Sequence, residues 1–287
     1  MEDYRCGFDE ERCVLRVHKF SVLMSLYKGE KPEFLRASLD SILSQTLLPN
    51  EILLVKDGLL THELEKVLSE YTNKSNIFRF LSFEENRGLG LALRDGVLAC
   101  SYEYIARMDT DDIAKSDRFE KQLMYLGKHP EIAMVGSWVT EFSTDPLKPD
   151  TFTKLPCDHI EIVKFAKQRN PFRHMTVIYK KSSVLDSGNY RNFLWFEDYD
   201  LWVRMIQKGY KMANIPEVLV NVRADRNMFA RRGGWNYLKQ DIKFQKILFN
   251  TKFTNIKEYL FNILIRSVVR IIPNRLRISF YRYLLRK

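Results

Sequence analysis

Cysteine is scarce in this sequence: the 287 residues include four, and none stands in the short paired spacing of a zinc or redox motif. Cys6 and Cys13 lie in a charged stretch where nothing supports the one disulfide they could form. We therefore expect reduced thiols, as in a cytosolic protein. Glycine and proline are also few, with 12 and 9 residues, which excludes a fibrous or linker-rich chain.

Long apolar runs are absent as well. The first twenty residues mix acids and bases, so we expect no secretory signal peptide. The most apolar stretch, Tyr259–Ile272, is interrupted by Asn262, Arg266, Ser267 and Arg270, and we expect it not to span a membrane. Hydrophobic residues make up 45% of the chain and charged residues 29%, which is ordinary globular usage and excludes wholesale disorder.

Acidic residues are nearly missing from the C-terminal end. Residues 223–287 contain 16 of the 46 Lys and Arg but 3 of the 36 Asp and Glu, whereas residues 1–222 contain 30 basic and 33 acidic side chains. The net charge of +10 therefore belongs to the C-terminal end, and any anionic partner is expected there first.

The first half of the chain alternates short apolar runs with helical patterns. Strands are predicted at Phe20–Ser25, Glu51–Asp57, Ile77–Leu81 and Tyr104–Met108, and helices after Pro32, at Thr61–Tyr71 and at Gly90–Cys100. This order predicts an α/β fold in which helices flank a mostly parallel, twisted sheet with right-handed crossovers.

The second half is less regular. Helices are predicted at Arg118–His129, Cys157–Arg169 and Phe196–Lys208, and strands at Ile132–Glu141, Met175–Tyr179, Lys211–Ile215 and Leu219–Arg223. From Trp235 onward helical patterns dominate. We expect two units, residues 1–235 and a basic helical extension, residues 236–287.

Three carboxylates follow the fourth predicted strand, at Asp109, Asp111 and Asp112. Ligands of open parallel sheets bind at the carboxyl ends of the strands, and clustered carboxylates repel one another unless a positive charge is bound. Mn²⁺ or Mg²⁺ shared with a diphosphate fits them, because these ions prefer oxygen ligands and take few from protein. A solvated turn in which Asp112 caps a helical turn is the alternative, and the position at a strand end favours the metal.

Five segments carry a resemblance to a known family: FSVLMSLYKGEKPEFLRASLDSILSQTLLPNEILLVKDG, NRGLGLALRDGV, YIARMDTDDIA, PFRHMTVIYKK and FEDYDLWVRM. In this order they resemble the inverting glycosyltransferases of family 2, with the glycosyltransferase-A fold, particularly enzymes of bacterial polysaccharide and O-antigen assembly. One departure is that the first strand of such enzymes more commonly ends in a Pro-x-Tyr-Asn-like sequence, where this chain has Ser25-Leu26-Tyr27-Lys28.

The resemblance implies that residues 1–235 bind a nucleotide-sugar. Ser25 and Tyr27 would line the nucleobase pocket, and Asp57 would accept the imide N–H of uracil or thymine, which makes a UDP-sugar the leading donor. Arg87 and Gly88 would approach the donor from the entry of a helix, whose N-terminus favours anions. Read without the resemblance, Asp57 is a turn residue and the glycine loop a plain helix entry.

The resemblance also assigns the residues around the metal. Asp109 would bind the ribose and the metal–diphosphate, Asp111 would be the stronger metal ligand, and Arg107 would face the donor. The metal would neutralise charge on the leaving nucleoside diphosphate. Arg107 could equally pair with an acid.

Glu197 and Asp198 open the predicted helix that contains Trp202, and they resemble the acidic acceptor-site motif of the family. Inversion needs a base opposite the leaving group, for which we choose Asp198, with Glu197 holding acceptor hydroxyls. As plain helix residues they would be favourable first-turn acids.

Four basic residues are candidate diphosphate or acceptor contacts: His174, Arg223, Arg231 and Arg232. Arg can bind phosphate with two parallel hydrogen bonds. A structural histidine and a solvated basic face are the alternatives.

The C-terminal helices combine apolar residues with arginines, and Pro273 interrupts them. Such helices favour anionic membranes, which suits a peripheral enzyme at the cytoplasmic membrane face with a polyprenyl-diphosphate-linked saccharide acceptor. The alternative is a helical pair packed on the catalytic unit.

The expected activity is therefore metal-dependent, inverting sugar transfer in cell-surface polysaccharide assembly. A sugar-phosphate nucleotidyltransferase would need a Gly-rich loop with Arg and Lys after the first strand, which Leu26–Glu30 does not supply. A non-catalytic protein whose basic tail binds nucleic acid or membrane is the third possibility, but no nucleic-acid motif is present and we expect no nucleic-acid partner.

Overall fold

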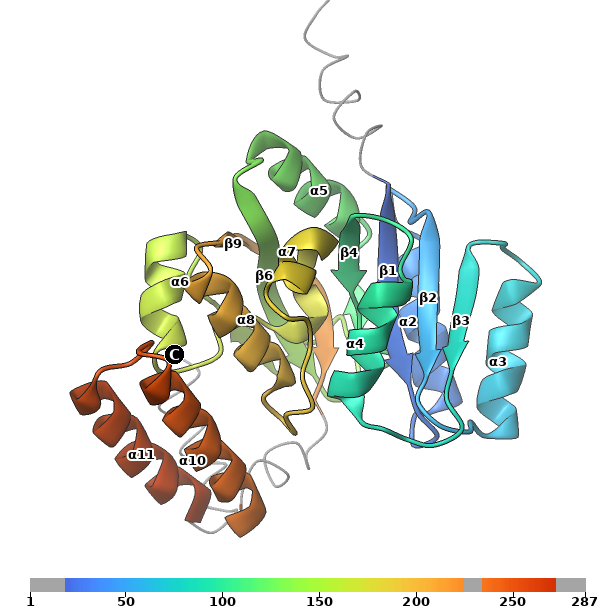
Figure 1. The fold of residues 1–287 in the computed structure, drawn as a ribbon. Helices are drawn as coiled ribbons and strands as arrows, with labels where there is room; N and C mark the ends of the chain where they lie inside the picture. Colours follow the sequence, from blue (N-terminus) through green and yellow to red (C-terminus); the bar gives the residue numbers. More distant parts are fainter. Residues whose placement is uncertain (1–18, 225–233, 272–287) are drawn as a thin grey trace, which may run out of the picture.

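The computed structural model describes residues 19–224 and 234–271, which form a mixed sheet with helices on both faces (Figure 1). The strands are β1 (Phe20–Leu26), β2 (Glu51–Lys56), β3 (Phe78–Ser82), β4 (Tyr104–Arg107), β5 (Ile113–Ala114), β6 (Ile132–Phe142), β7 (Thr151–Thr153), β8 (Ile178–Lys180) and β9 (Lys211–Arg223). Their order is β3-β2-β1-β4-β8-β6-β9-β5, with β7 paired to β6. The first four strands are mutually parallel, as is the pair β6 and β9, and the other pairings are antiparallel.

Helices connect and cover these strands. They are α2 (Pro32–Leu43), α3 (His62–Thr72), α4 (Leu89–Ala99), α5 (Arg118–Lys128), α6 (His159–Ala166), the 3-10 turn η1 (His174–Thr176), α7 (Lys181–Asp186), α8 (Glu197–Gln207), α10 (Trp235–Asn250) and α11 (Ile256–Ile271). Pro32 occupies the first turn of α2, and the Thr61 hydroxyl accepts a hydrogen bond from the Leu64 amide at the start of α3.

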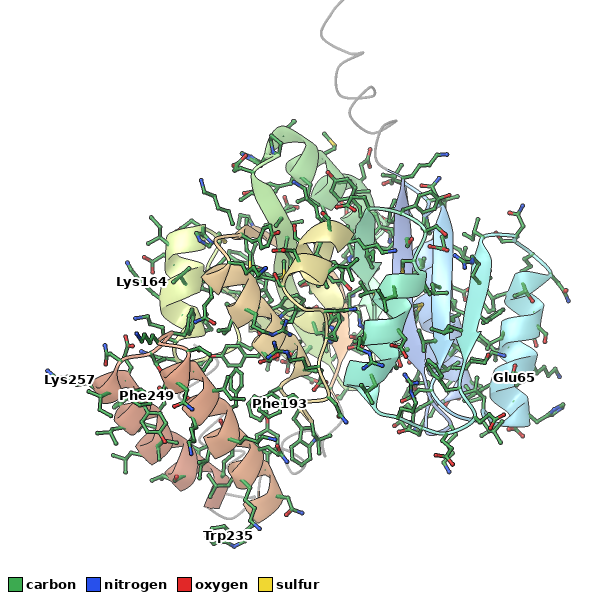
Figure 2. All side chains as sticks on the ribbon, viewed as in Figure 1. Glu65, Lys164, Phe193, Trp235, Phe249 and Lys257 are labelled. Carbon is green, nitrogen blue, oxygen red and sulfur yellow. The ribbon has the colours of Figure 1, made fainter. Side chains whose placement is uncertain are left out.

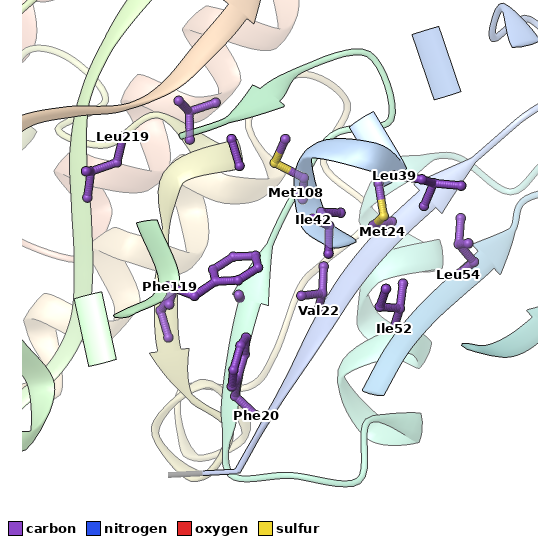
Figure 3. Close-up of a cluster of buried hydrophobic side chains, with 14 of the residues drawn as sticks. Phe20, Val22, Met24, Leu39, Ile42, Ile52, Leu54, Met108, Phe119 and Leu219 are labelled. Carbon is purple, nitrogen blue, oxygen red and sulfur yellow. The ribbon is translucent and has the colours of Figure 1, made fainter. Parts of the chain in front are cut away.

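Both faces of the sheet are buried, which explains why its parallel strands are apolar at consecutive positions. Val22 and Met24 of β1 and Ile52 and Leu54 of β2 pack against α2, α3 and α5 (Figure 3). Leu23 of β1 points to the other face, where α4 and α8 contribute the second cluster. Side chains alternate between the faces of a strand, so each strand supplies both layers.

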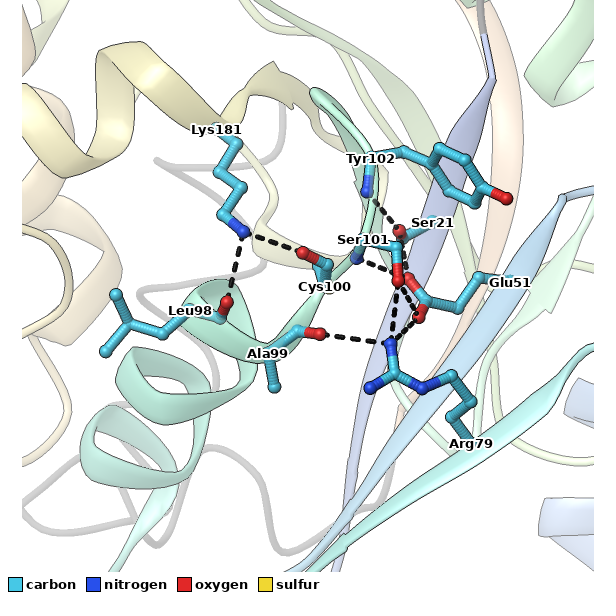
Figure 4. Close-up of polar contacts among 9 residues, drawn as sticks. All are labelled: Ser21, Glu51, Arg79, Leu98, Ala99, Cys100, Ser101, Tyr102 and Lys181. Atoms are coloured by element: carbon cyan, nitrogen blue, oxygen red, sulfur yellow. Dashed lines mark hydrogen bonds and ion pairs between the residues drawn. The ribbon is translucent and has the colours of Figure 1, made fainter.

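A polar cluster ties together the amino ends of the first strands (Figure 4). The buried Glu51 carboxylate accepts hydrogen bonds from Ser21, from Arg79 and from the amide and hydroxyl of Ser101, the last two at 2.8 Å. Burial alone would raise the pKa of Glu51, but these hydrogen bonds outweigh it and hold the pKa below its ordinary value. The cluster fixes the edge of the sheet from which β1, β2 and β4 start.

The parallel first half of the sheet agrees with the sequence prediction, and the second half requires three corrections. The strand predicted at Met175–Tyr179 is the 3-10 turn η1 followed by the short β8, and the helix predicted at Cys157–Arg169 is reduced to α6. The two strands predicted between Lys211 and Arg223 form one strand, because β9 continues along β6 through register shifts.

In Figure 1 the helices α10 and α11 lie side by side, with α10 on the side toward α8. Phe244 and Tyr237 of α10 join Phe196 and Tyr199 in an aromatic cluster, in which the Phe244 and Tyr199 rings are 4.6 Å apart. The predicted boundary at residue 235 coincides with the start of α10, and the division into two domains stays a prediction. Within the described ranges, no helix combines the length and the apolar character needed to cross a bilayer.

Candidate active site

The strand order reverses at β1. The chain adds β2 and β3 on one side of β1 and then returns to place β4 on the other. A crevice forms at such a switch point, outside the carboxyl ends of the two central strands. In this protein those ends lead directly into Tyr27 and into residues 108–112.

Asp109 is held at this edge by a buried arginine. The side chain of Arg107 is fully buried, and its guanidinium forms an ion pair with Asp109 and donates to the carbonyls of Met108 and Leu23. The Asp109 carbonyl accepts a hydrogen bond of 2.9 Å from Ser38 on α2. Asp109 itself is partly exposed, so its carboxylate is oriented and still reachable from solvent.

Asp111 and Asp112 are less well compensated. Burial, followed by the carboxylates of Asp109 and Glu30, raises the pKa of Asp111 to about 7. Burial and the neighbouring Asp111 raise the pKa of Asp112 well above its ordinary value. One Asp112 oxygen accepts from the Arg223 amide at 2.7 Å, and the other finds no hydrogen-bond partner among the described residues.

A divalent cation fits this group of acids. Among the residues that the structure describes, no three acidic, imidazole or thiol side chains converge closely enough to enclose a metal by themselves. Mg²⁺ and Mn²⁺ commonly take one or two protein carboxylates and complete their shell with phosphate oxygens and water. The raised pKa of Asp111 marks a site short of positive charge, so Asp109 and Asp111 suit a cation that arrives with a diphosphate.

Asp57, at the end of β2, is buried and binds a loop of its own chain. Its two carboxylate oxygens accept hydrogen bonds from the amides of Arg87 and Gly88, at 2.8 and 3.0 Å. Gly88, the N-cap residue just before α4, has φ +87°, a backbone conformation that favours glycine. Asp57 therefore shapes the entry to α4, and its contact with a nucleobase stays a prediction.

Arg87 is turned partly inward at the same entry. Its guanidinium pairs with Asp95 and lies 3.8 Å from the centre of the Phe83 ring. The Nε atom is buried and finds no hydrogen-bond partner among the described residues. The donor contact predicted for Arg87 remains untested.

The entry to α4 touches the start of α8. A side-chain carbon built on Gly90 would lie 2.4 Å from the Arg191 carbonyl and 3.3 Å from Cβ of Glu197. Glycine at this position lets the loop before α8 approach closely. This contact carries Glu197 to the same end of the sheet as Asp109.

Glu197 is largely buried and electrostatically coupled to the strand-end acids. Burial, then Asp198 and Asp109, raise the pKa of Glu197 to about 7, and Arg107 opposes the shift. Asp198 accepts hydrogen bonds from the Asn170 side chain at 2.6 Å and from the Tyr199 amide at 2.7 Å. The structure thus brings together Asp109, Arg107 and the acidic pair of α8, which are separated by about ninety positions in the sequence.

His174 lies beneath the site rather than in its opening. Its ring nitrogen is 3.0 Å from the Tyr190 hydroxyl, and the ring contacts Trp202. Burial, with the Arg107 guanidinium second, holds the pKa of His174 well below its ordinary value, so the imidazole is neutral. The predicted contact of His174 with substrate remains untested.

The other predicted residues lie around the opening or outside the described ranges. Arg223 is stacked over Phe34, at 3.9 Å from its guanidinium carbon to the ring centre, and its Nε donates to the Asp111 carbonyl. Tyr27 is half exposed and Ser25 is partly buried at the end of β1. Arg231 and Arg232, and also Cys6 and Cys13, lie outside the described residues.

Four contributors to the site were not singled out from the sequence: Glu30, Ser38, Arg118 and Asn170. Glu30 accepts from the Thr110 hydroxyl at 2.7 Å, and Arg118 is buried and donates to the Arg107 carbonyl at 2.7 Å. A signal for Arg118 exists in the sequence, since it stands on the apolar face of α5 where a charge is out of place. Glu30 and Ser38 give no such signal.

The sequence matches known glycosyltransferases over nearly its full length. The family described as "Glycosyl transferase family 2" matches residues 21–186. An uncharacterized glycosyltransferase of Haemophilus influenzae is 40% identical over 269 residues, covering 94% of this chain and 100% of that protein. The amylovoran biosynthesis glycosyltransferase AmsE of Erwinia amylovora is 40% identical, covering 88% and 94%.

A further relative is named for the reaction that it catalyses. The UDP-Gal:alpha-D-GlcNAc-diphosphoundecaprenol beta-1,3-galactosyltransferase of Escherichia coli is 35% identical over 269 residues, covering 94% of this chain and 97% of that protein.

Solved structures agree on the fold. TarS of S. aureus (residues 1–349) in complex with UDP-GlcNAc aligns with a TM-score of 0.65 at 15% identity, covering 87% of this chain and 72% of that one. The mannosyltransferase PcManGT from Pyrobaculum calidifontis, in complex with GDP-Man and Mn²⁺, aligns with a TM-score of 0.61 at 14% identity, covering 91% and 72%. At such identities the likeness concerns the fold alone.

Proposed function

This chain belongs to glycosyl transferase family 2, and from that membership we propose that it transfers a hexose from a UDP-sugar to a hydroxyl of a saccharide carried on polyprenyl diphosphate. The reaction contributes a sugar to a bacterial cell-surface polysaccharide. The E. coli relative, named for transfer from UDP-Gal to GlcNAc-diphosphoundecaprenol, supports both the donor class and the lipid-linked acceptor.

The arrangement of charge between the ends of β1 and β4 and the start of α8 supports this activity most directly. On one side stand Asp109 and Asp111, which suit a cation and a diphosphate. On the other stands the acidic pair of Glu197 and Asp198, close enough for Asp109 to raise the pKa of Glu197. A donor bound by the first pair would present its anomeric carbon toward the second.

Asp198 is the general base in this proposal. It takes the proton of the acceptor hydroxyl as the hydroxyl oxygen bonds to the anomeric carbon and the bond from that carbon to the diphosphate oxygen breaks. Attack from the face opposite the leaving group inverts the anomeric centre. The hydrogen bonds from Asn170 and Tyr199 fix the carboxylate and use two of its roughly four acceptor positions.

Glu197 has a different role beside that base. A pKa of about 7 leaves a share of this carboxyl protonated at neutral pH, so it can donate a hydrogen bond as well as accept one. This suits a residue that orients neighbouring acceptor hydroxyls. The two adjacent acids of α8 are thereby separated into a base and a holder of substrate.

Asp109 and Asp111 are the residues that would hold Mn²⁺ or Mg²⁺. The bound cation would supply charge neutralisation at the leaving diphosphate. Arg107 orients Asp109 from below. The Mn²⁺ bound in the PcManGT structure supports a metal for this fold.

Nucleotide binding measured by calorimetry tests the donor half of the proposal. UDP, GDP, dTDP and CMP would each be titrated with and without Mn²⁺. We expect UDP binding that depends on Mn²⁺, is lost in Asp111→Ala and is retained in Asp150→Ala, an exposed control. Absence of all nucleotide binding would contradict the proposal, whereas preference for GDP or dTDP would change the donor and leave the mechanism.

Transfer assays test the acceptor half. Asp198→Asn is expected to abolish transfer nearly completely while UDP still binds, because the amide cannot take a proton and the donor carboxylates are untouched. Full transfer by this variant would refute the assignment of the base.

A further inference from the structure

The outer face of α11 is apolar, and none of the described residues packs against it. Of the nineteen large hydrophobic side chains that are exposed among the described residues, six lie on this one helix, at Ile256, Leu260, Phe261, Leu264, Ile265 and Val268. The last five follow one another at alternating steps of one and three residues, which places them on one side of a helix. A contiguous patch of this kind marks a binding surface.

The opposite side of α11 holds the helix to the protein. Arg266 and Arg270 both reach the fully buried Asp241 of α10, at 2.6 and 3.1 Å, and Asn262 donates to the Lys167 carbonyl at 2.8 Å. These two arginines therefore stabilise the α10–α11 pair. The apolar face is left pointing outward by a helix whose other side is fully engaged.

The exposed charge on the α10–α11 pair is positive. Five exposed lysines, at positions 239, 243, 246, 252 and 257, lie on α10, on α11 and in their connection. The only acids between residues 235 and 271 are Asp241 and Glu258, and Glu258 pairs with Lys167 at 2.9 Å. In Figure 2, Trp235 and Lys257 point away from the molecule at opposite ends of the helical pair.

We propose that the apolar face of α11 lies on the surface of an anionic membrane, with the lysines of the α10–α11 pair contacting lipid phosphates. A one-sided apolar helix beside lysines is typical of interfacial binding, in which the apolar side enters the boundary between headgroups and acyl chains. The five residues from Leu260 to Val268 give this face a length of about 12 Å along the helix axis. The inference rests on the proposed lipid-linked acceptor. The sequence alone attributed membrane contact to the arginines of the C-terminal helices, whereas this proposal assigns it to the apolar face of α11.

Vesicle flotation of the full chain tests the proposal. Wild-type protein is expected to float with vesicles rich in phosphatidylglycerol, more weakly with phosphatidylcholine alone, and less as salt is raised. The double variant Phe261→Glu with Leu264→Glu should bind at least about tenfold more weakly, since two apolar side chains lose their place in the bilayer. The matched control, Leu147→Glu with Ile160→Glu, changes two exposed apolar residues outside α10 and α11 and should bind as wild type.

A second measurement separates membrane binding from chemistry and from misfolding. Lys246→Gln with Lys257→Gln leaves the apolar face intact and should weaken binding to the anionic vesicles alone. Transfer to a short-chain, water-soluble acceptor should be equal in wild type and all three double variants. If no chain transfers sugar, the proposed function fails while the vesicle result still stands.

Two outcomes would overturn the membrane proposal. One is equal vesicle binding by wild type and the Phe261→Glu, Leu264→Glu variant. The other is that wild type is a dimer in sedimentation equilibrium, the variant is a monomer, and neither binds vesicles. That result would make the face an interface between two copies of the chain.

Discussion

Two buried arginines support the acidic strand end at the scale of single residues. Arg107 pairs with Asp109, and Arg118 donates to the Arg107 carbonyl and to Gln122. Burial lowers the pKa of Arg118 to about 9, which still leaves it charged at neutral pH. The positive charge below the acids is thus fixed in the fold, and it does not depend on substrate.

Asn170 is expected to position Asp198. Replacing it with Ala removes the 2.6 Å hydrogen bond to that carboxylate. Hydrogen bonds to charged groups are worth about 1.5–3 kcal/mol, so kcat should fall about 10- to 100-fold while the affinity for UDP is unchanged. Steady-state kinetics and calorimetry check this, with the exposed Asn250→Ala as control. An unchanged kcat would exclude a positioning role.

The raised pKa of Glu197 predicts that the stability of the protein depends on pH. Its pKa is raised from 4.5 to about 7, so between these values the folded protein holds a proton that the unfolded chain has released. Its contribution to the free energy of unfolding is therefore present below about pH 4.5 and is lost as pH rises through 7, by roughly 3 kcal/mol in all. Glu197→Gln should remove this decline.

Urea unfolding of the metal-free protein at pH 5 and pH 8 measures this loss of stability. The free energy of unfolding of Glu197→Gln relative to wild type should be higher at pH 8 than at pH 5. The exposed control Glu33→Gln should show no such difference. Parallel pH profiles of wild type and Glu197→Gln would contradict the raised pKa.

At the scale of elements, the first half of the sheet is predictable from sequence because each parallel strand is a short apolar run between helical patterns. The short strands β5, β7 and β8 are not, since each has two or three residues. β5 and β8 are defined by partners far along the chain, whereas β7 pairs with the end of the preceding β6. The candidate site divides in the same way. Acids at strand and helix ends are visible in the sequence, whereas Asn170 and Glu30 contribute through contacts that only the folded chain creates.

The contact between α4 and the loop before α8 predicts sensitivity at Gly90. In Gly90→Ala the new carbon would lie 2.4 Å from the Arg191 carbonyl, a backbone atom that cannot turn aside. We expect a loss of about 1–3 kcal/mol in the free energy of unfolding, together with reduced transfer as Glu197 is displaced. Thermal unfolding and transfer assays check this against Leu89→Ala on the same turn of α4. Wild-type stability and transfer in Gly90→Ala would show that the loop before α8 can move away without cost.

At the scale of the whole molecule, the buried carboxylate of Asp241 on α10 holds α11 through two ion pairs. Asp241→Asn leaves Arg266 and Arg270 without their shared acid, and breaking a buried pair in this way costs about 3–5 kcal/mol. Hydrogen exchange should accelerate in α10 and α11 and remain slow in β1 and β2. Asp186→Asn, at an exposed ion pair, should cost less than about 1 kcal/mol. Uniform acceleration across the chain would instead indicate a single cooperative unit.

The strand order also sets the timing of assembly during translation. The four parallel strands lie within residues 20–107 and can pair as soon as that stretch has left the ribosome. The Arg223 amide that binds Asp112 stands 111 residues further along, and β5 waits equally long for β9. A nascent chain therefore completes its first half-sheet early and secures its acidic loop only after most of the polypeptide has been synthesised.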